Sequence, residues 1–215
     1  MIKDYLKFFK YSNTFLETPR LILRPMRVSD RDDMYDYASR EEVTKYLLWR
    51  AHASRDHTQR YLSYVVSLYK SGEFFDFAIE YRENGKMIGT CGFAAIDEKN
   101  DSVEVGYVIS PDYRGMGIAA EALDAVLRLA FCDMSVNRVE ARYMSENGAS
   151  RRVMEKCGMI FEGINRQKLL VKGEYRDIGV CSILASEYFG KNEKISAISE
   201  RRPRMIGIGK YFTKR

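Results

Sequence analysis

The stretch DYRGMGIAAEALDAVLRLAF, residues 112–131, carries the residues best suited to holding an anion. Arg114 is followed by two glycines, Gly115 and Gly117, and then by an apolar run with helical periodicity. The N-terminus of a helix presents free backbone N–H groups and a partial positive charge. Because glycines let a ligand approach the backbone closely, this stretch predicts a phosphate-binding or pyrophosphate-binding loop.

Two other phosphate-binding motifs fit this stretch less well. Residues 115–120 match the pattern G-x-G-x-x-A of dinucleotide-binding folds, and Glu140 lies at about the spacing of an acidic ribose ligand. In those folds the first glycine follows its strand almost at once, whereas here Pro111 to Arg114 intervene. A P-loop is excluded because no Gly-Lys-Ser/Thr sequence follows. The remaining pattern is Arg114-x-x-Gly117-x-Ala119, after a strand and a proline.

Glu104 is the strongest candidate for a catalytic base. In SVEVGYVIS, residues 102–110, alternation places Glu104, Gly106 and Val108 on one face of the predicted strand. A carboxylate among apolar strand residues is unusual if it is fully buried. A structural alternative is an exposed carboxylate paired with a cation.

A second candidate segment is NGASRRVMEKCGM, residues 147–159. Asn147 is a preferred helix N-cap and Gly158 a preferred helix terminator, so the pattern predicts a helix between them. Ser150 then lies in the first turn of that helix.

The elements that must position these residues predict a mixed sheet with helices packed on it. Asn84-Gly85 between two apolar runs is a strong hairpin signal, and a strand–helix–strand unit implies a parallel pair. Ser29 is a plausible N-cap for the first helix. The predicted order is a strand at 20–26, helices at 29–40 and 58–72, a hairpin at 74–96, a strand at 102–110, a helix at 118–131, a strand at 137–144, a helix at 147–158 and a hairpin at 161–184.

Length and composition are those of one globular domain with short extensions. The 215 residues are 46% hydrophobic and 30% charged. We expect an N-terminal extension with a short helix at 1–16, a domain at 17–189 and a basic tail at 190–215. No segment approaches the roughly 18 apolar residues of a membrane helix, so we expect a cytoplasmic protein without membrane contact. The four cysteines are far apart and indicate neither a zinc site nor a disulfide framework.

The positive charge is concentrated at the C-terminus. The last 25 residues hold eight Lys or Arg against two Glu, a net charge of +6, whereas the whole chain carries +5. Such a tail favours either contact with a ribosome or RNA, or a solvated segment or helix beside the domain. The sequence leaves the oligomeric state open, and a homodimer is compatible with it.

The two motifs together resemble a known family. VEVGYVISPDYRGMGIAAEAL is similar to the acyl-CoA-binding motif of the GCN5-related N-acetyltransferases (GNAT family). NGASRRVMEKCGMIFEG resembles their later motif in the RimJ/RimL-like branch, which acetylates the N-termini of ribosomal proteins. The resemblance covers roughly residues 17–189 and implies the GNAT-like acyl-CoA N-acyltransferase fold, an α/β (α+β mixed) fold with a mostly antiparallel sheet.

The resemblance implies acetyl-CoA as cosubstrate and no metal. The pyrophosphate would bind at Arg114 and the loop that follows it, and the backbone N–H of Val108 or Ile109 would face the thioester oxygen. Glu104 would be the base, acting through a water. Ser150 would lie near the CoA sulfur, and Asn147 would both cap its helix and contact CoA. The implied loop residues are Gly115, Met116, Gly117, Ile118 and Ala119.

The sequence departs from the broader family at one position. Many members carry a Tyr seven residues after the Asn of the later helix, where it protonates the leaving thiolate, but here that residue is Met154. Ser150 is the remaining candidate in this helix. The resemblance places Trp49 beside the groove that binds the acceptor amine. It places Asp177 near the active-site end of the strands in the last predicted hairpin.

Three functions remain open from the sequence. The first is acetylation of a protein N-terminal amine by direct attack in a ternary complex. The second is the same reaction on a small amine such as an amino acid, a polyamine or an antibiotic. The third is a non-catalytic acyl-CoA-binding module. The stretch 45–64 contains Asp56 against four Lys or Arg, which argues against a strongly cationic acceptor.

Overall fold

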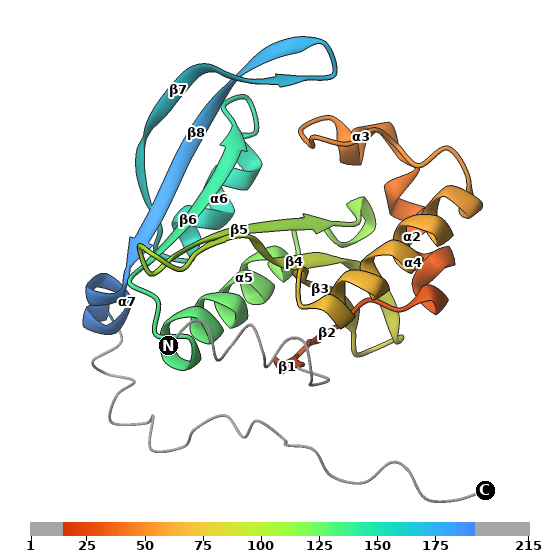
Figure 1. The fold of residues 1–215 in the computed structure, drawn as a ribbon, viewed down its shortest axis with the longest axis horizontal. Helices are drawn as coiled ribbons and strands as arrows, with labels where there is room; N and C mark the ends of the chain where they lie inside the picture. The colour runs from red at the N-terminus through yellow and green to blue at the C-terminus, as the bar shows by residue number, and fades with distance from the viewer. Residues whose placement is uncertain (1–14, 192–215) are drawn as a thin grey trace, which may run out of the picture.

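One eight-stranded sheet organises the chain, in the order β1-β2-β3-β4-β5-β6-β8-β7. The computed structural model describes residues 15–191 (Figure 1). Neighbouring strands are antiparallel except for β5 and β6, which are parallel. The strands are β1 (Leu16–Glu17), β2 (Leu21–Arg24), β3 (Phe75–Tyr81), β4 (Lys86–Asp97), β5 (Ser102–Ile109), β6 (Arg138–Met144), β7 (Ile160–Val171) and β8 (Glu174–Leu184).

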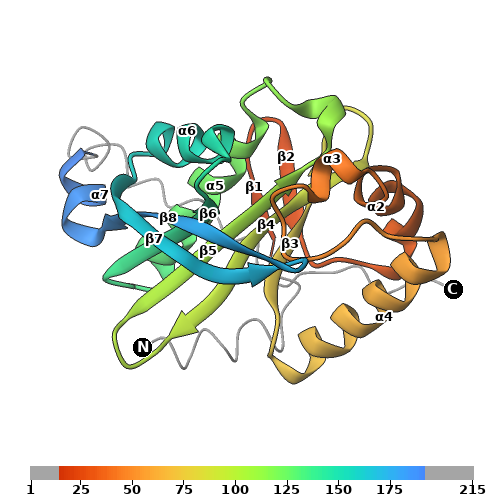
Figure 2. The same cartoon turned by 90° about the horizontal axis from the view of Figure 1, so that it is seen from above.

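Helices cover both faces of this sheet, as Figures 1 and 2 show. Short 3₁₀ turns η1 (Val28–Asp30) and η2 (Pro111–Tyr113) precede α2 and α5, and a π-helical turn η3 (Leu129–Asp133) ends α5. None of the helices between residues 15 and 191 has the length and apolar character of a membrane span. The helices are α2 (Arg31–Ala38), α3 (Glu41–Thr44), α4 (Arg55–Ser71), α5 (Ile118–Arg128), α6 (Gly148–Lys156) and α7 (Ala185–Lys191).

The predicted order of elements is confirmed, with β1, α3 and α7 as additions. Both hairpins turn where expected, with Gly85 and Gly173 at positive φ. The prediction that Ser29 caps the first helix is wrong, because η1 intervenes and Asp30 occupies the N-cap position. The helix expected in residues 1–16 lies outside the described residues apart from its last two, and so does the basic tail beyond Lys191.

Two hydrophobic clusters lie on opposite faces of the sheet. In β3 the side chains alternate, so Phe77 and Ile79 pack in one cluster with α5 and α6, while Ala78 packs in the other with α2 and α4. On β5, Val103 and Val105 belong to the α5 side and Val108 to the α2/α4 side. We call the face covered by α2 and α4 the groove face.

The pairing of β5 with β6 stops halfway along both strands. The ladder covers Ser102–Val105 against Arg138–Ala141, and the later residues of β5 pair with β4 alone. Beyond Ala141, β6 continues along β8. The two strands therefore diverge and leave the last four residues of β5 with one unpaired edge.

The tip of the β7–β8 hairpin reaches across to α3. Figure 1 shows this hairpin rising above the sheet with its tip pointing toward α3. Lys172 Nζ donates to the carbonyl oxygen of Thr44 over 2.6 Å, and Tyr46 packs against a small cluster that contains Met144 and Ile178. This contact bridges the groove face above the diverging strands.

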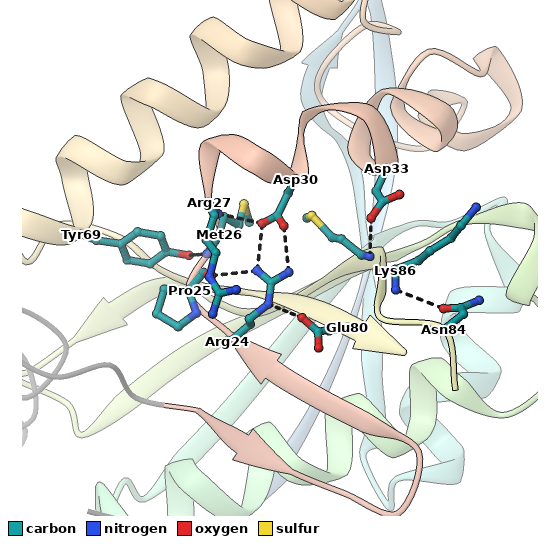
Figure 3. Close-up of polar contacts among 11 residues, drawn as sticks. Arg24, Pro25, Met26, Arg27, Asp30, Asp33, Tyr69, Glu80, Asn84 and Lys86 are labelled. Atoms are coloured by element: carbon teal, nitrogen blue, oxygen red, sulfur yellow. Dashed lines mark hydrogen bonds and ion pairs between the residues drawn. The ribbon is translucent and has the colours of Figure 1, made fainter. Parts of the chain in front are cut away.

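A buried ion cluster joins β2 to the start of α2 (Figure 3). The guanidinium of Arg24 binds both carboxylate oxygens of Asp30 at 2.8 and 2.9 Å and a Glu80 oxygen at 2.6 Å. Asp30 also accepts from the N–H of Arg27 over 2.7 Å. Nearby, Asp33 accepts from the N–H of Met87 at the start of β4. These bonds attach the groove-side helix α2 to the sheet.

Candidate active site

The loop before α5 has the geometry of an anion site. Gly115 and Gly117 both have positive φ, at 78° and 77°, which glycine adopts without steric penalty. Gly117 is the N-cap of α5 and provides no side chain for the first-turn N–H groups. Those N–H groups, which include that of Ala119, are available to a ligand. The side chain of Ile118 is buried in the core, so this residue offers its backbone alone.

Two cations flank this loop that the sequence patterns did not identify. A Cβ placed on Gly117 would lie 3.7 Å from Arg20 Nη2 and 3.8 Å from Lys156 Nζ. Arg20 also donates to the carbonyl oxygen of Met116 and is paired with Glu121 in the first turn of α5. Arg20 comes from the turn between β1 and β2 and Lys156 from the end of α6, so only the folded chain brings them to the glycines.

The opposite side of the loop is acidic. A cavity of about 410 Å³ lies between α2, the β3–β4 turn and residues 110–116, and its lining includes Asp33, Asp36 and Asp112. A phosphate is disfavoured there, so the side that carries Arg20 and Lys156 is the better anion site. The exposed Arg114 lies on this loop, 3.9 Å from Glu42.

The diverging edge of β5 exposes alternate backbone N–H groups. The N–H of Ser110 donates to Ile88 on β4 over 2.7 Å, and a Cβ on Gly89 would come within 2.1 Å of the Val108 carbonyl oxygen. Both observations show that the N–H and C=O groups of Val108 point toward β4. By alternation, the N–H of Ile109 is directed toward the opening, so of the two predicted oxyanion donors it is the better placed.

Glu104 lies on the groove face where β5 and β6 are still paired. Its side chain is 24% exposed and its Oε2 lies 3.4 Å from Arg142 Nη1. Arg142 also binds Glu140, the ladder neighbour of Glu104 on β6. Burial raises the pKa of Glu104, Arg142 lowers it, and Glu140 raises it, with a net shift upward. Glu104 is therefore paired with a cation, as expected if it is a structural carboxylate. The pKa of Glu104 is nevertheless raised, and its carboxyl group lies beside the point where β5 and β6 diverge.

Ser150 contacts Tyr107, which lies on the face of β5 opposite to that of Glu104. Tyr107 Oη lies 3.0 Å from Ser150 Oγ and donates to the Ser150 carbonyl oxygen over 2.8 Å. Burial raises the pKa of Tyr107. Asn147 caps α6 as predicted, because its side chain accepts from the Ser150 N–H. Met154 is 1% exposed in the core, so α6 presents no acid at that position.

The two residues predicted for the acceptor side have different surroundings. Trp49 is half-buried at the edge of the groove-face cluster, to which Val108 also belongs. Asp177 accepts from the N–H of Gln167 over 2.7 Å, and its carbonyl oxygen accepts from the N–H of Ser145. Gln167 has a positive φ of 49°, so Asp177 holds an irregular turn of β7.

A second cavity continues the groove along β6, β7 and β8. Its volume is about 550 Å³, and Glu140 and Arg142 lie at its border. Between Asn165 and Leu169 the pairing of β7 with β8 is irregular, which widens this region. Because Arg142 contacts Glu104, this cavity adjoins the groove face at Glu104.

Comparison with known proteins gives one consistent result. Residues 20–160 match the family model of the acetyltransferase (GNAT) domain. The chain is 33% identical over 175 residues to an uncharacterized N-acetyltransferase p20 of Bacillus licheniformis, covering 81% of this chain and 98% of that one. It is 26% identical over 170 residues to the ribosomal protein uS5-alanine N-acetyltransferase of Escherichia coli, covering 75% and 86%.

Solved structures agree with these relatives. A GCN5-related N-acetyltransferase from Brucella melitensis superposes with a TM-score of 0.76 at 28% identity, covering 87% of this chain and 86% of that one. The mixed, mostly antiparallel sheet predicted from the motifs is thus the GNAT fold. The chain belongs to the GNAT family, and it is an N-acetyltransferase.

Proposed function

We propose that this enzyme transfers an acetyl group from acetyl-CoA to the N-terminal α-amine of a protein. The observation that carries the proposal is the alignment of three features along β5: the raised-pKa carboxyl of Glu104, the unpaired edge that ends at Ile109, and the uncapped N-terminus of α5. The similarity to the uS5-alanine enzyme supports an α-amine as acceptor.

The residues fit acetyl-CoA, which supplies the acetyl group as a thioester when it is bound. The pyrophosphate would contact the N–H groups from Gly115 to Ala119, with Arg20 and Lys156 beside them. The unpaired edge of β5 suits the amide-containing pantetheine arm, because its exposed N–H and C=O groups need partners.

Direct attack by the acceptor amine on the thioester gives the carboxylate of Glu104 a role as proton acceptor. The acceptor nitrogen forms a bond to the carbonyl carbon, the carbon–sulfur bond breaks, and the nitrogen loses a proton. Glu104 takes that proton through a chain of waters, because Glu104 lies about 13 Å along the strand from Val108 at 3.3 Å per residue. The Ile109 N–H stabilises the negative charge that develops on the carbonyl oxygen.

Ser150, with Tyr107 beside it, stabilises the leaving sulfur. Because the phenol proton of Tyr107 goes to the Ser150 carbonyl oxygen, the Ser150 hydroxyl donates to Tyr107 Oη in the resting site, and it turns its proton to the developing thiolate during the reaction. Since burial raises the pKa of Tyr107, the phenol stays protonated and acts as a hydrogen-bond partner rather than as a source of the proton. Solvent then protonates the thiolate.

The second cavity, beside Arg142, favours a peptide over a single small amine. The cavity of about 550 Å³ beyond Arg142 provides room for residues that follow the reacting one. Its border contains both Glu162 and Lys168, so it presents both charge signs to a chain.

The proposal is tested by thiol release from acetyl-CoA with two acceptor panels. One panel holds peptides that begin with Ala, Ser or Met, and the other holds amino acids, polyamines and aminoglycosides. We expect turnover on peptides, with a product that carries the acetyl group on its α-amine by mass spectrometry. Turnover confined to small amines would assign the second function, and tight CoA binding without turnover on either panel would favour the non-catalytic module.

We expect Gly117→Val to weaken acetyl-CoA binding by about tenfold or more, as a rise in its KM. A β-branched residue at a φ of 77° is strained by about 1–3 kcal/mol, and its methyl groups would enter the space between Arg20 and Lys156. Gly85→Val is the matched control, since Gly85 has a φ of 70° with nothing within 4 Å of its Cβ position. An unchanged KM in Gly117→Val would remove this loop from the site.

A further inference from the structure

In the proposed reaction, neither acetyl-CoA nor the acceptor amine occupies the acidic cavity beside the loop before α5. This cavity of about 410 Å³ lies between α2, the β3–β4 turn and residues 110–116. Its volume is in the range of cavities that bind small organic molecules. The cavity is therefore large enough for a ligand of its own.

The charged groups that line the cavity are mainly acidic. They are four carboxylates and one ammonium group, a net charge of −3, and the pairing of Asp112 with Arg40 reduces this to −2. Asp36 and Glu83 form no ion pair with another described residue. Carboxylates gathered in this way attract cations. The four carboxylates are Asp33, Asp36, Glu83 and Asp112, and the ammonium group is that of Lys86.

A buried residue of the lining, Ser110, has a hydroxyl group without a partner. Ser110 follows β5 directly and is 6% exposed. Its backbone is satisfied, because its N–H donates to Ile88 and its carbonyl oxygen accepts from the N–H of Tyr113. Its hydroxyl makes no capping hydrogen bond to η2 and bonds to no other residue between 15 and 191.

The Ser110 hydroxyl opens into the cavity. Among the described residues, Tyr37 Oη is the one unpaired side-chain oxygen or nitrogen that is shut off from solvent. Since Ser110 Oγ is unpaired and is not that atom, it borders open space, and the space that Ser110 lines is this cavity. An unpaired hydroxyl on a concave acidic surface is suited to accept a hydrogen bond from an ammonium group.

The carboxylates are too dispersed to hold a metal ion. Between residues 15 and 191, no three or more His, Cys, Asp or Glu side chains are grouped in a way that could hold one. The carboxylates come from α2, from the β3–β4 turn and from the loop after β5. Dispersed negative charges match a ligand whose positive charges are also separated.

Apolar and aromatic side chains lie between these charges. Met87 and Ile88 are each 2% exposed and form part of the cavity floor, whereas Met116 is exposed at its edge. The rings of Tyr81 and Tyr113 meet edge-on, 5.3 Å apart at their centroids, and also line the cavity. Methylene groups pack against such surfaces, and ring faces attract ammonium groups.

We propose that this cavity binds a linear organic polycation, a molecule such as a polyamine whose ammonium groups are separated by methylene chains. Its ammonium groups pair with Asp36 and Glu83, and one of them donates to the Ser110 hydroxyl. This ligand is distinct from the acceptor, so the proposal does not depend on which amine is acetylated.

A bound polycation favours acetyl-CoA on the neighbouring loop. Asp112 and Met116 line the cavity, and Gly115 of the anion-binding loop lies between them in the chain. A cation in the cavity offsets the carboxylates that repel the phosphates of acetyl-CoA. Because coupling between two ligands is reciprocal, we expect each ligand to tighten the binding of the other, by about fivefold.

Calorimetric titration of spermidine into the full-length protein at low ionic strength tests the site. We expect one equivalent to bind. Binding should weaken about tenfold or more in Asp36→Asn, which loses a charged partner, and about threefold in Ser110→Ala, which loses a neutral hydrogen bond. Because Ser110→Ala changes no charge, unchanged binding in this variant would mean general attraction to an acidic surface and would overturn the site.

Glu83→Gln and Glu73→Gln are a matched pair of variants. Both glutamates are exposed and flank β3, with Glu83 after its end in the cavity lining and Glu73 before its start. Spermidine binding should weaken in Glu83→Gln alone. Equal losses in the two variants, or no binding by wild type, would contradict the proposal.

Two further arms distinguish the sources of such a cation. If spermidine is acetylated and its KM rises in Asp36→Asn, the cavity belongs to the acceptor site and the separate ligand is ruled out. If a lysine-rich peptide with a blocked N-terminus binds and spermidine does not, the partner is a protein and the proposal fails.

The coupling is measured by titrating acetyl-CoA with and without saturating spermidine. The fivefold gain in acetyl-CoA affinity should appear in wild type and disappear in Asp36→Asn. An equal acetyl-CoA affinity with and without spermidine in wild type would overturn the coupling.

Discussion

Glu104→Gln is expected to lower kcat for acetyl transfer by about 100-fold or more, the usual contribution of a general base. Glutamine keeps the size of the side chain and its contact with Arg142 but cannot accept the proton. Because the pKa of Glu104 is raised mainly by burial, a neutral side chain there should not destabilise the fold. The measurements are kcat with saturating acetyl-CoA and peptide, and the unfolding temperature.

The pH dependence provides an independent check on Glu104. A base must be ionised, so wild-type kcat should fall as the pH drops through the raised pKa of Glu104. Arg142 lowers that pKa, and its removal in Arg142→Gln should raise it further. The acidic limb of the kcat profile should therefore move to higher pH in Arg142→Gln.

Glu162→Gln is the control for Glu104. Glu162 lies on the same network of ion pairs, but Arg138 and Ser182 lower its pKa to about 2, which is unsuited to a base. With saturating peptide its replacement should leave kcat within about twofold of wild type, because Glu162 lines the cavity beyond Arg142 and not the place of the reacting atoms. If Glu104→Gln retains more than a third of wild-type kcat, the base lies elsewhere.

Arg24→Met is expected to destabilise the protein by about 3–5 kcal/mol, the cost of leaving buried carboxylates without their cation. The Arg24 and Asp30 side chains are 8% and 6% exposed, and Arg24 also holds Glu80. For a chain of this length the loss corresponds to a fall of about 10 °C in Tm. Thermal and urea unfolding should agree on the size of the change.

Arg55→Met provides the comparison for an exposed pair. Arg55 and Asp32 are 56% and 61% exposed, and such pairs contribute about 1 kcal/mol or less. Equal destabilisation by the two substitutions would mean that the Arg24 cluster is not the attachment of α2 to the sheet. The double variant Arg24→Met with Asp30→Leu should recover part of the loss, because it removes the uncompensated charge.

The local signals in the sequence determined where most elements begin and end. Asn84-Gly85, Asn147 and Gly158 act through backbone preferences that need no distant partner, and the structure places turn, cap and terminator at those residues. The anion-binding loop was predictable for the same reason, since two glycines and the helix that follows are contiguous in the chain. Alternation along β5 was likewise enough to place Glu104 and Val108 on one face.

Only the tertiary structure decided which side chains meet. Arg20 and Lys156 approach Gly117 from the β1–β2 turn and from α6, and Tyr107 of β5 meets Ser150 of α6. Ser29 does not cap α2 as predicted. Asp30 forms a buried ion pair with Arg24 of β2, and this pair determines where α2 starts.

Asp76, a carboxylate on β3 that no sequence pattern singled out, shows the same limit most clearly. In the sequence it is one acidic residue among apolar neighbours of a hairpin strand. Its line across Gly92 to Gly106 exists only once three strands are paired in register. Desolvation by packed helices then raises its pKa, and burial is a property of the assembled chain rather than of any segment. The sequence by itself determined the local geometry and the family, and the fold decided which groups surround Glu104 and the loop before α5.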